Sequence, residues 1–170
     1  MKRILLWTAV LALTLAFGWM PARASEGNHR FGLAATYWVA LDDIDVNDLD
    51  DNGLTLALSF QYRPSLVGLE LALELLPDRF GEDAVAPQAY FILGRTLYAA
   101  AGVGIVYRDG DFADDPFFAF RAGFDFEIFP AIYLDLFASY RFNDTTDLED
   151  EGEKIDTDTV FLGAAVRVRF

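Results

Sequence analysis

Residues 117–142 read FFAFRAGFDFEIFPAIYLDLFASYRF, and large apolar side chains recur there at every second position. The even-numbered positions carry mostly Phe, Ile, Leu and Tyr, whereas the odd-numbered ones mix small residues with charges such as Arg121 and Asp125. A period of two over this length predicts two β-strands, because successive side chains of a strand point to opposite faces. Phe129-Pro130-Ala131 interrupts the pattern. We therefore expect a hairpin with a tight turn, paired even position to even position, since a slip of one residue would place charges on the apolar face.

The same alternation recurs along the rest of the chain and predicts six more strands. They are residues 30–41, 54–63, a segment after Ser65 that runs to Leu75, 87–93, 97–108 and 157–170. Residues 87–93 alternate least cleanly. With the hairpin, the fold class is all-β, with eight antiparallel strands in up-and-down order.

The expected connections alternate in length, and the long ones hold most of the acid. Of the 27 Asp and Glu residues, 21 lie in or beside residues 42–53, 77–86, 109–116 and 143–156. Alternate connections of a meander share one end, so we expect an acidic crown at one end and three short turns at the other. The formal charge of −14 should repel nucleic acid. The chain has no Cys, which excludes disulfides and thiol-based metal sites.

Residues 1–24 are expected to form a secretory signal peptide. Lys2 and Arg3 precede an apolar run, and Ala22-Arg23-Ala24 fits a cleavage site. A transmembrane anchor is the alternative, but the run is short and ends in the cleavage motif. Residues 25–170 then form one domain, in which no segment has the uninterrupted apolar run of a spanning helix.

The volume of the apolar face decides which side of the sheet points inward. Eight strands with about five large apolar side chains each would overfill a barrel whose interior is just wide enough for side chains. The Gly, Ala, Ser and Thr positions, with a few charges, would fit. We therefore expect a transmembrane β-barrel whose apolar face meets lipid, in preference to a two-sheet sandwich or a lipocalin.

Several segments resemble the small eight-stranded outer-membrane β-barrels of the OmpA/OmpX type. They are the leader, YAAAGVGIVY at 98–107, FAFRAGFDFE at 118–127 and the closing GAAVRVRF. The resemblance implies a monomer in the outer membrane of a Gram-negative bacterium, in contact with outer-membrane lipid. It also implies that the barrel-assembly machinery reads Val166, Val168 and Phe170 as a C-terminal signal.

Eight charged residues are expected on the inward face towards the short turns. They are Arg30, Arg63, Glu70, Asp125, Glu127, Asp135, Arg167 and Arg169. Because a buried unpaired charge is costly, we expect ion pairs, with Asp135–Arg167 and Arg63–Glu70 as two of them. Such a network predicts a plugged lumen. The alternative is a narrow porin-like channel for small solutes, similar to the OmpW type.

The acidic connections invite a metal hypothesis, which the sequence supports poorly. Residues 48–53 match the start of an EF-hand loop, but Ser59 stands where the bidentate Glu is required. Divalent cations or a surface ligand could still bind at the carboxylates; a solvated, repulsive surface is the simpler interpretation.

An enzyme is the least favoured function, and no cofactor is expected. Outer-membrane barrel enzymes of the resembled kind rely on a histidine, and this chain has only His29. We expect His29 to be a mobile residue before the first strand. The role predicted from sequence is structural: envelope integrity or surface interaction through the acidic loops.

Overall fold

The computed structural model describes residues 27–40, 52–77, 84–108, 111–113, 115–148 and 153–170, which form ten strands in one sheet. The long strands are β1 (His29–Ala40), β2 (Asn52–Tyr62), β3 (Val67–Leu76), β4 (Ala84–Gly94), β5 (Leu97–Gly104), β8 (Phe117–Phe129), β9 (Ile132–Leu148) and β10 (Glu153–Arg169). Two short strands, β6 (Tyr107–Arg108) and β7 (Asp111–Phe112), form a small hairpin beside β4.

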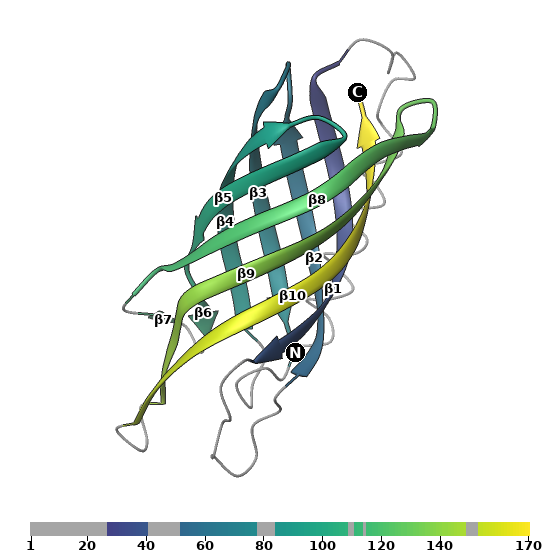
Figure 1. The fold of residues 1–170 in the computed structure, drawn as a ribbon. Coiled ribbons are helices and arrows are strands. Elements are labelled where there is room, and N and C mark those ends of the chain that lie inside the picture. Colours follow the sequence, from purple (N-terminus) through teal and green to yellow (C-terminus); the bar gives the residue numbers. More distant parts are fainter. Residues whose placement is uncertain (1–26, 41–51, 78–83, 109–110, 114, 149–152) are drawn as a thin grey trace.

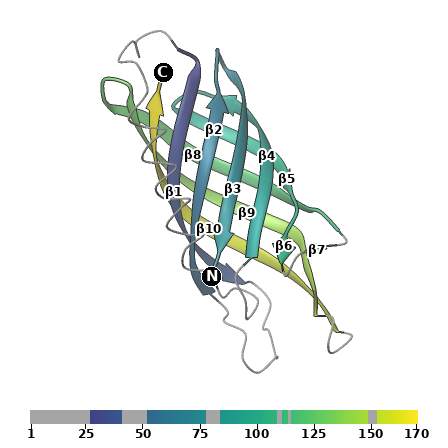
Figure 2. The ribbon, with the colours of Figure 1, turned by 180° about the vertical axis from the view of Figure 1, so that it is seen from behind.

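The sheet closes on itself as a barrel of eight antiparallel long strands. Each long strand pairs with the next along the chain, and β1 pairs with β10. Figures 1 and 2 show the two sides of this tilted barrel, with the start of β1 beside the end of β10. The expected fold class is therefore confirmed. In the described part of the chain, no helix is long and apolar enough to cross a bilayer.

The β8–β9 hairpin has the predicted register. Phe118 pairs with Phe142 and Phe120 with Tyr140, so even positions face even positions. The turn consists of Pro130 and Ala131, and Ala131 has a positive φ of 65°. Its N–H donates to Oε1 of Glu127 at 2.8 Å, which fixes the tight turn that the sequence predicted.

Several strand boundaries differ from the sequence expectation. Residues 143–156 were expected as a loop, but β9 continues to Leu148 and β10 begins at Glu153. Thr145, Thr146 and Ile155 in this ribbon are β-branched and favour strands, while its many charges remove the alternation on which the prediction relied. The expected strand 97–108 ends at Gly104, and the expected loop 109–116 contains β7. The strand expected at 87–93 is longer, from Ala84 to Gly94.

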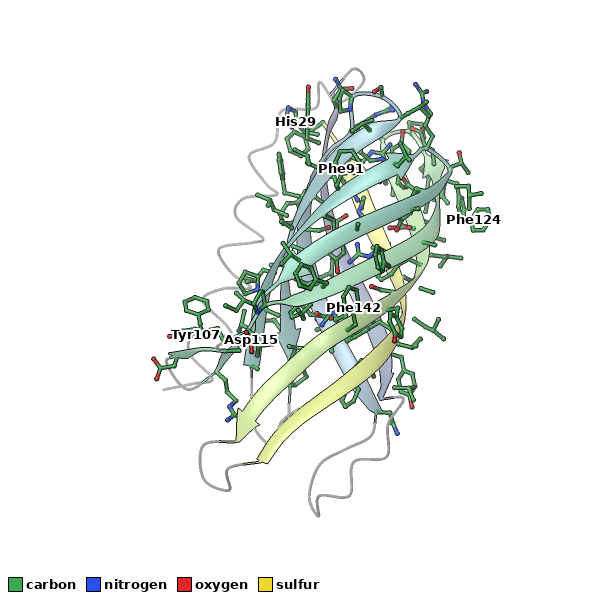
Figure 3. All side chains as sticks on the ribbon, turned by 60° about the vertical axis from the view of Figure 1, so that its left-hand side comes forward. His29, Phe91, Tyr107, Asp115, Phe124 and Phe142 are labelled. Atoms are coloured by element: carbon green, nitrogen blue, oxygen red, sulfur yellow. The ribbon has the colours of Figure 1, made fainter. Side chains whose placement is uncertain are left out.

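The outer face of the barrel carries the large apolar side chains, as the volume argument predicted. Leu54, Leu71, Leu97 and Phe120 are each about 60% exposed, at 66%, 62%, 64% and 59%. Figure 3 shows Phe91, Phe124 and Phe142 pointing away from the barrel axis. A soluble monomer rarely exposes so continuous an apolar surface, so this face is built to meet lipid.

Candidate functional site

The candidate site is the barrel interior, where charged side chains lie in successive levels along the axis. The level nearest the short turns contains a pocket, here called the mouth pocket, with a volume of about 390 Å³. Its charged lining residues are Arg30, Arg63, Arg95, Asp125, Glu127 and Arg169.

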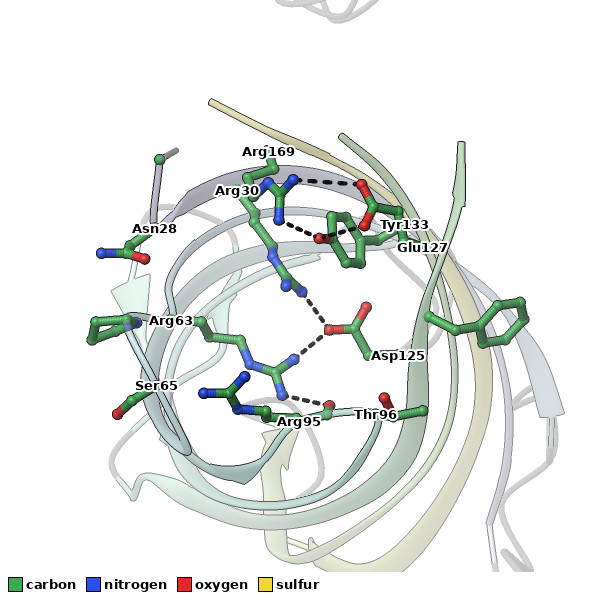
Figure 4. Close-up of a pocket in the computed structure, with 13 residues that line it drawn as sticks. Asn28, Arg30, Arg63, Ser65, Arg95, Thr96, Asp125, Glu127, Tyr133 and Arg169 are labelled. Carbon is green, nitrogen blue, oxygen red and sulfur yellow. Dashed lines mark hydrogen bonds and ion pairs between the residues drawn. The ribbon is translucent and has the colours of Figure 1, made fainter. Parts of the chain in front are cut away.

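Asp125 on β8 is the centre of the mouth pocket. Arg30 and Arg63 both donate to its Oδ2, and Figure 4 shows the two guanidinium groups converging on it. Arg63 also donates to the carbonyl oxygens of Gly94 and Arg95, at 2.8 Å and 2.7 Å. Gly94 has a φ of 119°, and a side chain there would collide with the Leu97 carbonyl. The glycine turn therefore shapes the wall on which Arg63 is held.

A second group of charges lies on the rim of the same pocket. Arg169 donates to the Tyr133 hydroxyl at 2.6 Å and lies 3.5 Å from Glu127. The Tyr133 hydroxyl donates to Glu127 at 3.2 Å, and the Arg30 guanidinium stacks 3.8 Å above the Tyr133 ring. Glu127 is exposed, so it belongs to the rim of the mouth pocket rather than to the buried interior.

The next level, here called the closed middle, consists of Gln61, Glu70, Arg121, Asp135 and Arg167. Arg167 donates to Asp135 and lies 3.2 Å from Glu70, which also accepts from Arg121 at 2.8 Å and from Gln61. Asp135, Arg167 and Glu70 are 0%, 1% and 2% exposed. Four charges are therefore balanced two against two with almost no contact with solvent, as burial of charge requires.

A third level is organised by Glu74 on β3. Arg141 on β9 donates to it from across the lumen. Gln88 and Thr55 donate to it from the two strands beside β3, at 2.7 Å and 2.6 Å. Tyr90 donates to Gln88 at 2.7 Å and so holds the amide in place. The carboxylate accepts three bonds, which offsets the loss of its hydration.

Aromatic rings fill the space around the interior arginines. The Arg121 guanidinium lies 4.1 Å from the Tyr90 ring and 4.6 Å from the Phe137 ring. Arg141 lies in the same way between Phe117 and Phe161, at 4.7 Å and 3.9 Å. Each pair combines apolar packing with cation–π attraction. Mainly small residues were expected on the inward face from the sequence. The inward place of these rings in the alternation indicates their position and was overlooked.

An apolar layer covers the charged levels on the side away from the short turns. It consists of Leu76, Ala84, Ala86, Val106 and Phe117, all 4% exposed or less. Between this layer and the closed middle the described interior holds a cavity of about 20 Å³, which has room for about one water molecule.

The structure brings together most of the predicted charges, but with one different pairing. Asp135 pairs with Arg167 as expected, although the two are diagonal neighbours, since Asp135 lies opposite Ala165 and Arg167 opposite Tyr133. The expected Arg63–Glu70 pair is wrong. Gln61 lies opposite Glu70, while Arg63 follows the end of β2 and reaches across to Asp125.

Three further charged residues belong to the network, and the sequence analysis left them out. They are Glu74, Arg121 and Arg141. Arg121 and Arg141 lie on the inward, odd-numbered face of the stretch with which the analysis began, so their position in the alternation was a sufficient signal.

The predicted assembly signal lies on the outer face, at the short-turn end of β10. Val166 is exposed, and the Phe170 ring lies 6.1 Å from the His29 ring and 6.5 Å from the Phe60 ring. The Phe170 N–H donates to the His29 carbonyl at 3.0 Å. The expectation of a mobile His29 was wrong, because the residue begins β1 and stacks in this aromatic cluster.

The acidic connections lie largely outside the described residues, including residues 48–51 of the EF-hand-like segment. Within the part of the chain that the structure describes, no three His, Asp or Glu residues are grouped as ligands of one metal ion.

Comparison with known proteins identifies the fold. No protein-family model matches the chain, and no curated protein does. Among solved structures, Neisserial surface protein A matches with a TM-score of 0.61 and 14% identity over 84% of this chain and 97% of its own. The outer-membrane protein AlkL matches with a TM-score of 0.50 and 16% identity over 89% and 93%. The chain has the fold of a small outer-membrane β-barrel.

The outer-membrane barrel fold also gives the molecule an orientation. Bacterial barrels of this kind place short turns on the periplasmic side and long loops outside the cell. The lipid-facing band and the fold place this barrel in an outer membrane, as the resemblance implied. In a barrel that follows this arrangement, the mouth pocket is on the periplasmic side, because it lies at the short-turn end.

Proposed function

We propose that this outer-membrane barrel has a structural or surface-interaction role and that its lumen is closed by ion pairs. The observation that carries the proposal is the filled interior. Balanced charges at the closed middle lie beneath an apolar layer, and the cavity found among the described residues between them measures about 20 Å³. A hydrated solute would have to displace buried partners of Glu70 and Asp135, which is costly.

The ion pairs also support a structural role because they connect opposite walls. Glu74 on β3 pairs with Arg141 on β9, and Glu70 on β3 pairs with Arg121 on β8. Pairs of this kind link strands that share no backbone hydrogen bonds. They resist flattening of the barrel, which suits a protein that contributes to envelope integrity.

The acidic loops are the proposed interaction surface. Their carboxylates, which we expect outside the cell, suit divalent cations or a cationic ligand, and no catalytic residue or cofactor is proposed. Binding of Ca²⁺ to the refolded chain, compared with a variant in which the Asp residues of 42–51 are Asn, tests this part. Equal binding by the two chains would exclude this loop as a cation site.

Single-channel recording tests the closed lumen. The mature chain, refolded and inserted into a planar bilayer, should give no steady conductance steps. Folding is checked by gel migration, since the barrel should migrate differently before and after boiling. Steady steps from heat-modifiable protein would instead favour the narrow OmpW-like channel.

A further inference from the structure

The mouth pocket carries a surplus of positive charge in a strongly acidic protein. Arg30, Arg63, Arg95 and Arg169 line it, against the two carboxylates of Asp125 and Glu127 (Figure 4). The chain as a whole has a formal charge of −14, and most of its acid belongs to the opposite end. A net charge of about +2 in this pocket is therefore a local property of the periplasmic mouth.

The carboxylates present do not use up the donors of the four arginines. Asp125 serves Arg30 and Arg63 through one oxygen, and its other oxygen, Oδ1, has no partner among the described residues. The side chain of Arg95 is exposed and makes no ion pair within the described part of the chain. The Nε of Arg169 is buried and unpartnered there. Guanidinium donors therefore remain for a further acceptor.

Three of the four arginines are also held in place before any ligand arrives. Arg30 is stacked on Tyr133, Arg169 is bonded to the Tyr133 hydroxyl, and Arg63 is fixed by two carbonyl groups. The side chains of Arg30 and Arg63 are 13% and 4% exposed. Pre-ordered, partly desolvated guanidinium groups bind an oxyanion more strongly than mobile surface ones, because less conformational entropy is lost.

We propose that the mouth pocket binds a phosphate ester, through Arg95, Arg169 and Arg30. Guanidinium forks match the oxygens of a phosphate group, and about 390 Å³ accommodates a phosphate with its organic substituent. The aromatic cluster of His29, Phe60, Tyr62 and Phe170 lies on the outer surface at the same end, where aromatic girdles mark the membrane interface. The ester is therefore either a phospholipid head group or a free periplasmic compound.

Two titrations in maltoside detergent, which contains no phosphate, separate these sources. Glycerol 3-phosphate is titrated by calorimetry against the refolded mature chain. Binding of short-chain phosphatidylglycerol, with an uncharged glycolipid of equal chain length as control, is counted by native mass spectrometry. Binding of the soluble ester alone assigns a free phosphate compound, and binding of the phospholipid assigns the head group. Binding of neither overturns the proposal.

Charge-matched variants show whether the pocket is responsible. Arg95→Gln and Arg169→Gln should each weaken phosphate binding about tenfold, the loss of one charge-assisted hydrogen bond. Arg108→Gln removes the same charge at the opposite end and should bind like the parent chain. Equal affinity in all three variants would overturn the proposal. Arg95 is in an exposed turn, so its variant remains decisive if Arg169→Gln fails to fold, as judged by gel migration.

Discussion

The mouth pocket and the closed middle each hold an aspartate paired with arginine, but they differ in the empty space around that pair. Asp125 and Asp135 lie directly opposite each other on β8 and β9, and each is held by arginine. Asp125 borders a pocket of about 390 Å³, whereas Asp135 is fully buried and its partner Arg167 lines a cavity of only about 20 Å³. The difference indicates that access to water, rather than the number of ion pairs, decides what each charge contributes to stability.

The largest expected effect comes from Asp135→Ala. The change leaves Arg167 and Arg121 sharing Glu70 in a closed space, and we expect a loss of about 3–5 kcal/mol in the free energy of unfolding. Asp125→Ala should cost less, about 1–2 kcal/mol, because water in the mouth pocket can solvate Arg30 and Arg63. Urea unfolding of both variants in lipid vesicles measures the two losses.

A double variant checks the assignment to stranded charge. Asp135→Ala with Arg167→Ala should recover part of the loss, since Glu70 keeps Arg121 and Gln61 as donors. Asp125→Ala and Asp135→Ala could instead lower the free energy of unfolding equally, with the effects of Asp135→Ala and Arg167→Ala adding up in the double variant. Water would then reach the closed middle as freely as the mouth pocket.

A smaller effect should follow from adding one methyl group. A Cβ at Gly163 on β10 would lie 2.4 Å from the tip of the Phe137 ring, which packs on Arg121. We expect Gly163→Ala to cost about 1–3 kcal/mol by overpacking. Ser65→Thr adds a methyl group at the mouth pocket and should change stability by less than about 0.5 kcal/mol. If thermal unfolding in detergent shows the same change for both, the middle is not tightly packed.

The smallest effect on stability is expected outside the lumen. The Phe170 ring has aromatic neighbours on one side and is partly exposed, so Phe170→Ala should cost about 1 kcal/mol. If Phe170 is read during assembly, insertion into the outer membrane of cells should nevertheless fall several-fold. Phe124→Ala, on the lipid face of β8, should lose similar stability and insert normally. Normal insertion of both variants would remove Phe170 from the assembly signal.

The alternation of the sequence predicted the faces of the barrel well, because lipid on one side and packed side chains on the other give a strict period of two. The register of the β8–β9 hairpin followed from the same rule. The rule does not help where charged residues interrupt the alternation, as they do in residues 143–156. The outer parts of β9 and β10 were for this reason expected to be a loop.

The pairing of the interior charges was only partly predictable. Neighbouring strands bring Asp135 near Arg167, and the sequence order shows this. Arg63 and Asp125 are 62 residues apart, and Glu74 and Arg141 are 67 apart, in segments that are not neighbours in the sheet. The curvature of the closed barrel and the length of the arginine side chain bring them together, and no local pattern contains either quantity.

The extended ends of β9 and β10 change how far the acidic charge of the loops acts. Phe118, Phe120, Tyr140 and Phe142 stack on the outer face near the loop end, where aromatic girdles mark the membrane interface. β9 continues six residues beyond Phe142, which at 3.4 Å per residue corresponds to about 20 Å. The Debye length at physiological salt is about 8 Å, so a charge carried at the level of Leu148 would be screened from the lipid surface. The field of such a charge would act on approaching molecules and not on the membrane beneath it.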